Sequence, residues 1–407
     1  MIFNNIIYNY NLQTDKVAGL LYELAFVLFV ITCPLFVVIS NIFLIILLFL
    51  FLYSLKKERF FFQYNTAFRI LWGLMFFLII KSIFNKSFAD DFVYYQKSYS
   101  FLLIPVLYTK IKNSSLLKNG LIFSVLLCVF VATINLIKYY CVFHYFPLTE
   151  GLEVNQILKI ERPYFGFLLI IGIVFCAELI VKSNTIQKLI YLTIALIFTG
   201  FMFFISARNA ILTLSLLIII YFMFFLHLSF LKKIFLSIGV LIAIGLIAAN
   251  SSNFKTRIFY NKNPSEIIKN NLENEPRIII WPSVFDATNS INFNCFVGFS
   301  NIKTANDSLT NSCVQRLYNN PGRAEWFKSI RYNSHNQFLS YYLIGGICGF
   351  SLIAIFFTTL FINHYKHFFE FAIIFAIFCF FVFENVLERQ FGCQLTAILL
   401  SIIVFKK

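Results

Sequence analysis

The chain has 407 residues, of which 60% are hydrophobic, 19% aromatic and only 13% charged, with a formal net charge of +15. Soluble domains carry about 25% charged residues, so this chain has too few to cover a water-facing surface. Its 55 Phe and 21 Tyr exclude a disordered chain as well. The composition therefore predicts an all-α polytopic membrane protein.

Crossing a bilayer takes about 17–25 apolar residues in a helix, and this window predicts about twelve transmembrane helices. The fourth contains Pro105 and is short, and the first two are joined by a tight hairpin near Pro34. The predicted spans are 17–34, 37–55, 66–84, 98–109, 119–138, 164–181, 188–205, 210–230, 234–249, 344–363, 368–384 and 391–405.

The basic residues predict the orientation of these spans. With the N-terminus in the cytoplasm, about twice as many Lys and Arg fall in the short inner connections as in the short outer ones. Both termini are therefore expected to be cytoplasmic. The positive charge is mainly a topology signal, and no nucleic acid is expected as a partner.

One connection is much longer than the others. It divides the chain into residues 1–249 with spans one to nine, a polar loop over 250–334, and residues 335–407 with spans ten to twelve. The loop is expected outside the cytoplasm and partly helical, because long loops are usually functional or disordered. It contains Cys295 and Cys313, which could form a disulfide in an oxidising compartment or remain two free thiols.

Among the five histidines, only His144 and His335 are expected on the outer side, and His144 is typical of an interfacial aromatic belt. His335 stands where the polar loop re-enters the membrane, next to Asn336. An imidazole at this boundary is suited to accept a proton from a hydroxyl. A residue that only begins a helix is the alternative interpretation.

Three arginines are predicted on the outer side of the membrane, although most basic residues of the chain are predicted on the inner side. Arg208 lies in a short polar break between two spans, Arg162 precedes the sixth span, and Arg277 lies in the long loop. A guanidinium binds phosphate oxygens through paired N–H donors. Together with His335, these residues suit a lipid diphosphate, although each could be a topology residue.

Metal chemistry has little support, since no cluster of Cys and His has the spacing of a metal site. Asp90 and Asp91 in an outer loop could bind a divalent cation or form a solvated acidic pair. Glu23 and Glu178 are predicted within spans, where ionisable groups are costly. They indicate either a functional site or pairing inside the bundle.

The same residues carry a resemblance to a known family, the O-antigen ligase / O-antigen polymerase family of bacterial envelope enzymes. The matching motifs are concentrated over residues 205–350. The predicted number of spans and the long loop before the tenth span extend the resemblance to most of the chain. It is carried by Arg208 with Leu212, by Arg277 with Trp281 and the later Gly298, and by His335–Asn336 with the later Gly346.

The resemblance implies a glycosyltransferase of the bacterial inner membrane that acts at the periplasmic face without a metal or other cofactor. It implies a glycan on undecaprenyl diphosphate as donor, a lipid A–core sugar as acceptor, and membrane lipids as surroundings. Arg208 and Arg277, with Arg162, would bind the diphosphate. His335 would orient or deprotonate the acceptor hydroxyl.

Related functions remain open from the sequence. An O-antigen polymerase would use a second lipid-linked glycan as acceptor, and a protein-directed oligosaccharyltransferase would use a protein. A transporter or flippase could also have twelve spans, but it would leave the long loop and His335 without a role. The ligase is the interpretation that the sequence favours.

Overall fold

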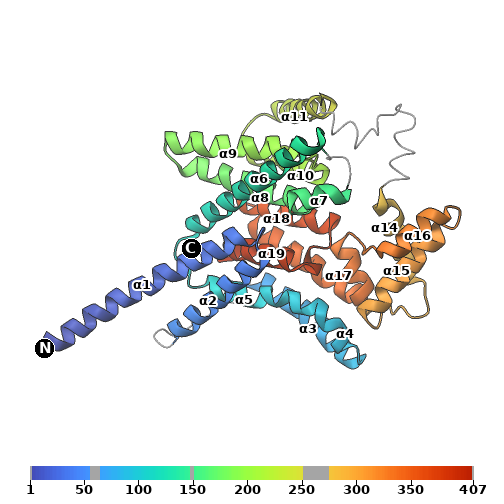
Figure 1. Ribbon diagram of the computed structural model, residues 1–407, viewed down its shortest axis with the longest axis horizontal. Coiled ribbons are helices and arrows are strands. Elements are labelled where there is room, and N and C mark those ends of the chain that lie inside the picture. The colour runs from blue at the N-terminus through green and yellow to red at the C-terminus, as the bar shows by residue number, and fades with distance from the viewer. Residues whose placement is uncertain (1, 56–64, 147–150, 251–274, 406–407) are drawn as a thin grey trace.

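The computed structural model describes residues 2–55, 65–146, 151–250 and 275–405. The expectation of an all-α protein is confirmed for these ranges, which are 83% helical and contain no β-strand. Figure 1 shows a bundle of helices with a smaller helical group, α14 to α16, at one side.

The helices of the N-terminal half are α1 (Ile2–Thr32), α2 (Val37–Leu55), α3 (Thr66–Phe84), α4 (Phe88–Tyr95), the 3-10 turn η1 (Gln96–Tyr99), α5 (Ser100–Tyr108), α6 (Ser114–Phe143), α7 (Gly151–Leu158), α8 (Arg162–Lys182) and α9 (Thr185–Phe204). Those that follow are α10 (Arg208–Ile220), the π-helical turn η2 (Tyr221–Phe225), α11 (Phe230–Asn250), α14 (Pro276–Thr288), α15 (Ile302–Arg316), α16 (Pro321–Ile330), α17 (Gln337–His364), α18 (Phe368–Phe383), the 3-10 turn η4 (Val386–Glu388) and α19 (Gln390–Val404).

Eight helices in the described ranges are long and apolar enough to cross a membrane. Three shorter apolar helices, Val17–Thr32, Phe368–Phe383 and Gln390–Val404, coincide with further predicted spans. These helices indicate a membrane protein. The full count of twelve stays a prediction.

The fourth predicted span, 98–109, is helical but is not among the eight long apolar helices. It forms the end of η1 and the nine-residue helix α5, and the backbone that joins α4, η1 and α5 stays right-handed helical, so the helical segment runs from Phe88 to Tyr108. Phe101 and Ile104 on α5 are fully buried. Part of the apolar character of this segment therefore serves packing inside the protein, and the fourth crossing stays a prediction.

Helix α8 lies at the centre of the bundle and α11 at its edge, as Figure 1 shows. Within the membrane-spanning windows, 78% of the residues of α8 are buried inside the protein, against 6% for α11. Because α8 contacts α6, α9, α10 and α18, the first residue of α8 is held firmly by its neighbours. That residue is Arg162.

Several helices begin or end at the same end of the bundle, which we call the loop end. Helices α8, α10, α17 and α19 begin there, and α9 and α18 end there. Helix α14 begins beside them, after the segment 251–274 that lies outside the described residues. The loop end therefore gathers short connections from distant parts of the chain.

Helix α17 is broken at Gly346, whose φ is 58° and ψ is −154°. The turn 294–299 from the preceding loop fills the break, and its Gly298 also has a positive φ of 74°. Its backbone supplies partners to the broken helix through the hydrogen bonds Phe299 N to Leu343 O (2.9 Å), Ile347 N to Cys295 O (2.8 Å) and Cys348 N to Phe296 O (3.2 Å).

Lys81 of α3 completes this junction. Its ammonium group donates to the backbone oxygen of Phe299 at 2.6 Å and to that of Ile344, and its side chain is buried. A buried carbonyl without a partner is costly, so Lys81 satisfies an oxygen that the broken helix leaves free. Lys81 thereby joins α3 to the turn 294–299 and to α17, the helix that follows His335 in the chain.

Candidate functional site

Three helices, α8, α10 and α14, begin at one cavity of about 480 Å³ at the loop end. The three arginines singled out from the sequence, Arg162, Arg208 and Arg277, all line this cavity. They come from three different parts of the chain. The other lining residues are Asn155, Pro163, Ser206, Ala207, Asn209, Ala210, Glu275, Ile278, Trp281 and Phe383.

The electrostatics of this cavity favour an anion. The first backbone N–H groups of a helix have no partner within it, and the helix dipole adds positive potential at that end. Three such helix starts and three guanidinium groups meet here. Phosphate groups bind at helix N-termini for this reason.

The short connection from α9 to α10 explains the position of Arg208. Helix α9 ends at Phe204, Ser206 has a left-handed φ of 51°, and Arg208 is the first residue of α10. The backbone N–H of Arg208 donates to Ser206 O at 2.9 Å. This tight turn allows the side chain no position far from the loop end, as the sequence predicted.

Glu275, the residue before α14, bridges two of the arginines. One of its carboxylate oxygens accepts from Arg208 at 3.0 Å and the other from Arg277 at 2.7 Å. Burial raises the pKa of this carboxyl, but the charges of Arg277 and Arg208 outweigh it and hold the pKa below its usual range. The carboxylate is therefore ionised at neutral pH.

Arg277 also connects the cavity to the end of α18. It donates to the backbone oxygen of Phe383 at 3.0 Å and to the carboxylate of Glu384 at 2.7 Å. The last carbonyl groups of a helix lack partners within the helix, and Arg277 satisfies one of them. The guanidinium is thus fixed from two sides, by Glu275 and by α18.

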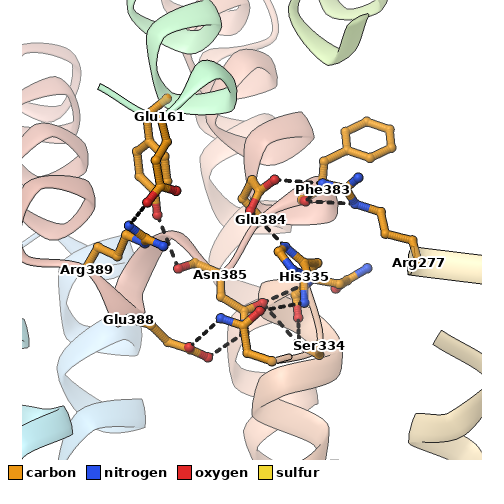
Figure 2. A network of polar contacts seen from close by, with 12 residues as sticks. Glu161, Arg277, Ser334, His335, Phe383, Glu384, Asn385, Glu388 and Arg389 are labelled. Atoms are coloured by element: carbon orange, nitrogen blue, oxygen red, sulfur yellow. Dashed lines mark hydrogen bonds and ion pairs between the residues drawn. The ribbon is translucent and has the colours of Figure 1, made fainter. Parts of the chain in front are cut away.

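The second oxygen of Glu384 contacts the histidine predicted as the base. Figure 2 shows His335 and Arg277 approaching Glu384, and the His335 Nδ1 atom lies 3.1 Å from Glu384 Oε2. A carboxylate at Nδ1 favours the tautomer that carries its proton there. The other ring nitrogen is then free to accept a proton.

The backbone around His335 is held in an unusual conformation. His335 has a φ of 45°, a left-handed value that is uncommon outside glycine. Asn385 Oδ1 accepts from the Ser334 hydroxyl at 3.1 Å, a contact that Figure 2 shows, and from the Asn336 backbone N–H at 2.7 Å. Asn385 therefore fixes the residues on both sides of the histidine.

Trp281 connects the cavity to the segment that contains His335. Trp281 lines the cavity, and its indole N–H donates to Ser334 O at 3.1 Å. His335 itself does not line the cavity, but Glu384 follows the lining residue Phe383 directly in the chain. One run of contacts thus passes from Arg208 through Glu275, Arg277 and Glu384 to His335.

The sequence did not single out Glu275, Glu384 or Asn385. Glu384 and Asn385 end a helix of 16 residues with an apolar interior, and polar residues at such an end are usually solvated. Glu275 lies among other acids and asparagines of the loop. A signal existed for Glu384 and Asn385, because they lie at the same predicted membrane face as the arginines.

Two of the remaining sequence candidates, Asp91 and Glu178, have structural partners. Asp91 is buried and accepts from the Ser87 hydroxyl and from the Ile302 backbone N–H, so it anchors the start of α15. Glu178 pairs with Lys118 at 2.6 Å, so of the two alternatives given for it above, pairing inside the bundle is the one that the structure shows. No group of three or more His, Cys, Asp or Glu in the described ranges could hold a metal ion.

Cys295 and Cys313 are two free thiols, the first exposed and the second buried. Glu23 accepts a hydrogen bond from the Lys112 backbone N–H at 3.0 Å. His144 ends α6 in a left-handed conformation next to the Tyr140 ring. None of these residues lines the arginine cavity.

Comparison with known families gives one match. Residues 192–354 match the family model described as O-Antigen ligase, and this stretch contains Arg208, Arg277 and His335 but neither Arg162 nor Glu384. The resemblance to the O-antigen ligase / O-antigen polymerase family is thereby confirmed. Members of this family are glycosyltransferase-like enzymes of lipopolysaccharide or glycan biosynthesis. No curated protein matches the chain.

Proposed function

We propose that the protein is an O-antigen ligase that moves a glycan from undecaprenyl diphosphate to a sugar hydroxyl of lipid A–core at the periplasmic face of the inner membrane. The observation that carries the proposal is the cavity that Arg162, Arg208 and Arg277 share, joined to His335 through Glu384. The family match supports the same class of enzyme.

The arginines suit the leaving group of this reaction. When the bond between the sugar and the diphosphate breaks, the diphosphate oxygen gains negative charge. Fixed guanidinium groups and helix N-termini stabilise such charge without having to reorganise. Arg208 and Arg277 would take most of the diphosphate charge, and Arg162, which is nearly buried on α8, would bind the remaining oxygens.

His335 suits the other half of the reaction. The acceptor oxygen forms a bond to the anomeric carbon of the donor as its proton passes to the free nitrogen of His335. Glu384 keeps the other nitrogen protonated and stabilises the imidazolium that forms. The same carboxylate contacts Arg277, so diphosphate binding and the position of the base are coupled.

A polymerase of the same family is the second candidate. It would share the arginines and His335 but use a second lipid-linked glycan as acceptor. The family match does not distinguish the two functions.

Complementation of a bacterial strain lacking its own ligase tests the proposal. Wild type should restore surface glycan, whereas Arg208→Ala and His335→Ala should insert normally and lose it. Arg331→Ala is the matched control, because the Arg331 side chain is 66% exposed and pairs only with Asp307 among the ion pairs of the described residues. Surface glycan at the wild-type level with His335→Ala would remove the histidine from the chemistry.

The lipid-linked intermediate that accumulates separates the two candidate functions. Long glycan on undecaprenyl diphosphate in the inactive variants indicates loss of a ligase. Single repeat units on the same carrier indicate loss of a polymerase, and would replace the ligase with the second candidate.

A further inference from the structure

Glu275 is an anion inside a cavity that is otherwise built for anions. Its carboxylate spans the gap between the Arg208 and Arg277 guanidinium groups, with one oxygen on each. It lies on the residue directly before α14, where the helix dipole also favours negative charge. The carboxylate therefore uses N–H donors that a phosphate group would otherwise bind.

The two arginines differ in how much they depend on Glu275. Arg277 keeps a second carboxylate, that of Glu384, and the backbone oxygen of Phe383. For Arg208, the ion pair with Glu275 is the one that the described residues provide. Releasing Glu275 would thus free Arg208 most completely, while Arg277 would stay in place.

We propose that Glu275 is a stand-in for the diphosphate: it holds Arg208 and Arg277 together while the cavity is empty, and the incoming diphosphate displaces it. This inference rests on the proposed function, because it takes the cavity to be the diphosphate site. Glu275 is then a positioning residue that weakens binding of donor and of the diphosphate product alike. A weaker grip on the product favours its release after transfer.

The physical basis is competition for the same donors. Each carboxylate–guanidinium contact is charge-assisted, and such hydrogen bonds are about twice as strong as neutral ones. A diphosphate that binds the Nη2 group of Arg208 must displace the Glu275 oxygen that this group contacts. Removing the charge of Glu275 also removes a repulsion between two anions at close range.

Binding of inorganic pyrophosphate to the full-length protein in detergent tests the proposal, with calorimetry as the readout. Glu275→Gln keeps the shape of the side chain and removes its charge. We expect it to bind pyrophosphate about tenfold more tightly than wild type, the factor that one lost charge-assisted hydrogen bond makes. Glu325→Gln on α16 makes the same change of charge on an exposed side chain, and should leave the affinity within about twofold.

Equal or weaker binding by Glu275→Gln would overturn the inference. If that variant does not fold, Glu275→Asp supplies the test, because its carboxylate is one methylene shorter and can no longer span both arginines; it too should bind more tightly. The proposed function fails separately, if Arg208→Ala and Arg277→Ala bind pyrophosphate as well as wild type does. Arginine variants that weaken binding, together with an unchanged Glu275→Gln, would reject the stand-in role alone.

Discussion

Replacing Gly298 with alanine should separate the turn 294–299 from the broken helix α17. A Cβ atom at this position would lie 2.5 Å from Leu343 O, 2.7 Å from Gly345 N and 2.8 Å from Gly346 N, where ordinary contact begins at 3.4 Å. All three atoms are backbone, so no side chain can rotate away. The turn or the helix must move instead.

The expected cost follows from the contacts at the junction. A left-handed alanine costs about 1–2 kcal/mol. Each of the three backbone hydrogen bonds that join the turn to α17 contributes about 0.5–1.5 kcal/mol. If the junction opens, we expect Gly298→Ala to lower the free energy of unfolding by about 3–6 kcal/mol.

Thermal unfolding of the detergent-purified protein measures this loss. Gly322→Ala is the matched control, since a Cβ there would meet no atom within 4 Å and alanine suits a helix better than glycine by up to about 1 kcal/mol. It should unfold at the wild-type temperature or slightly above. A Gly298→Ala variant as stable as wild type would refute the view that the turn is locked into α17.

Three further predictions concern buried charges. Lys81→Met should lower stability by about 2–4 kcal/mol, because two carbonyl oxygens lose their donor; an unchanged unfolding temperature would contradict this role. Glu384→Gln should slow glycan transfer by about 100-fold, because His335 loses the charge that orients it; a wild-type rate would argue against that. The lowered pKa of Glu275 means that its ion pairs add stability above the usual carboxyl range and lose it as the pH falls through that lowered pKa. Wild type should therefore lose more stability on acidification than Glu275→Gln, and unfolding curves that stay parallel across pH would refute this.

The arginine cavity could be predicted in outline because its signal is local. Arg208 lies in a connection so short that its position follows from the flanking spans, and positive charge on the outer side is unusual. The sequence also indicated that Arg277 and His335 belong to the same side. The structure adds that one cavity collects the arginines.

The carboxylates could not be predicted because their partners are remote in sequence. Glu384 acquires its role only when α18 ends beside α14 and the start of α17. Glu275 resembles its acidic neighbours until folding places it between Arg208 and Arg277. Pairing across such distances depends on tertiary packing, which hydrophobic periodicity does not encode.

The short helix α5 illustrates a second limit of sequence patterns. Its residues Phe101, Ile104 and Leu107 are as apolar as those of a span, and all three are fully buried inside the protein. An interior helix and a membrane-spanning helix have the same composition when both are surrounded by apolar groups. Composition alone therefore does not separate burial inside the protein from a membrane crossing for this segment.

The most direct test of the account measures donor binding and glycan transfer separately in the purified protein. With an undecaprenyl-diphosphate glycan as donor, Arg208→Ala should weaken binding and slow transfer by about 100-fold or more. His335→Ala should bind the donor within about twofold of wild type but transfer it about 100- to 10,000-fold more slowly. Transfer by His335→Ala at the wild-type rate, or undiminished donor binding by Arg208→Ala, would contradict the central claim that arginines bind the diphosphate while the histidine activates the acceptor.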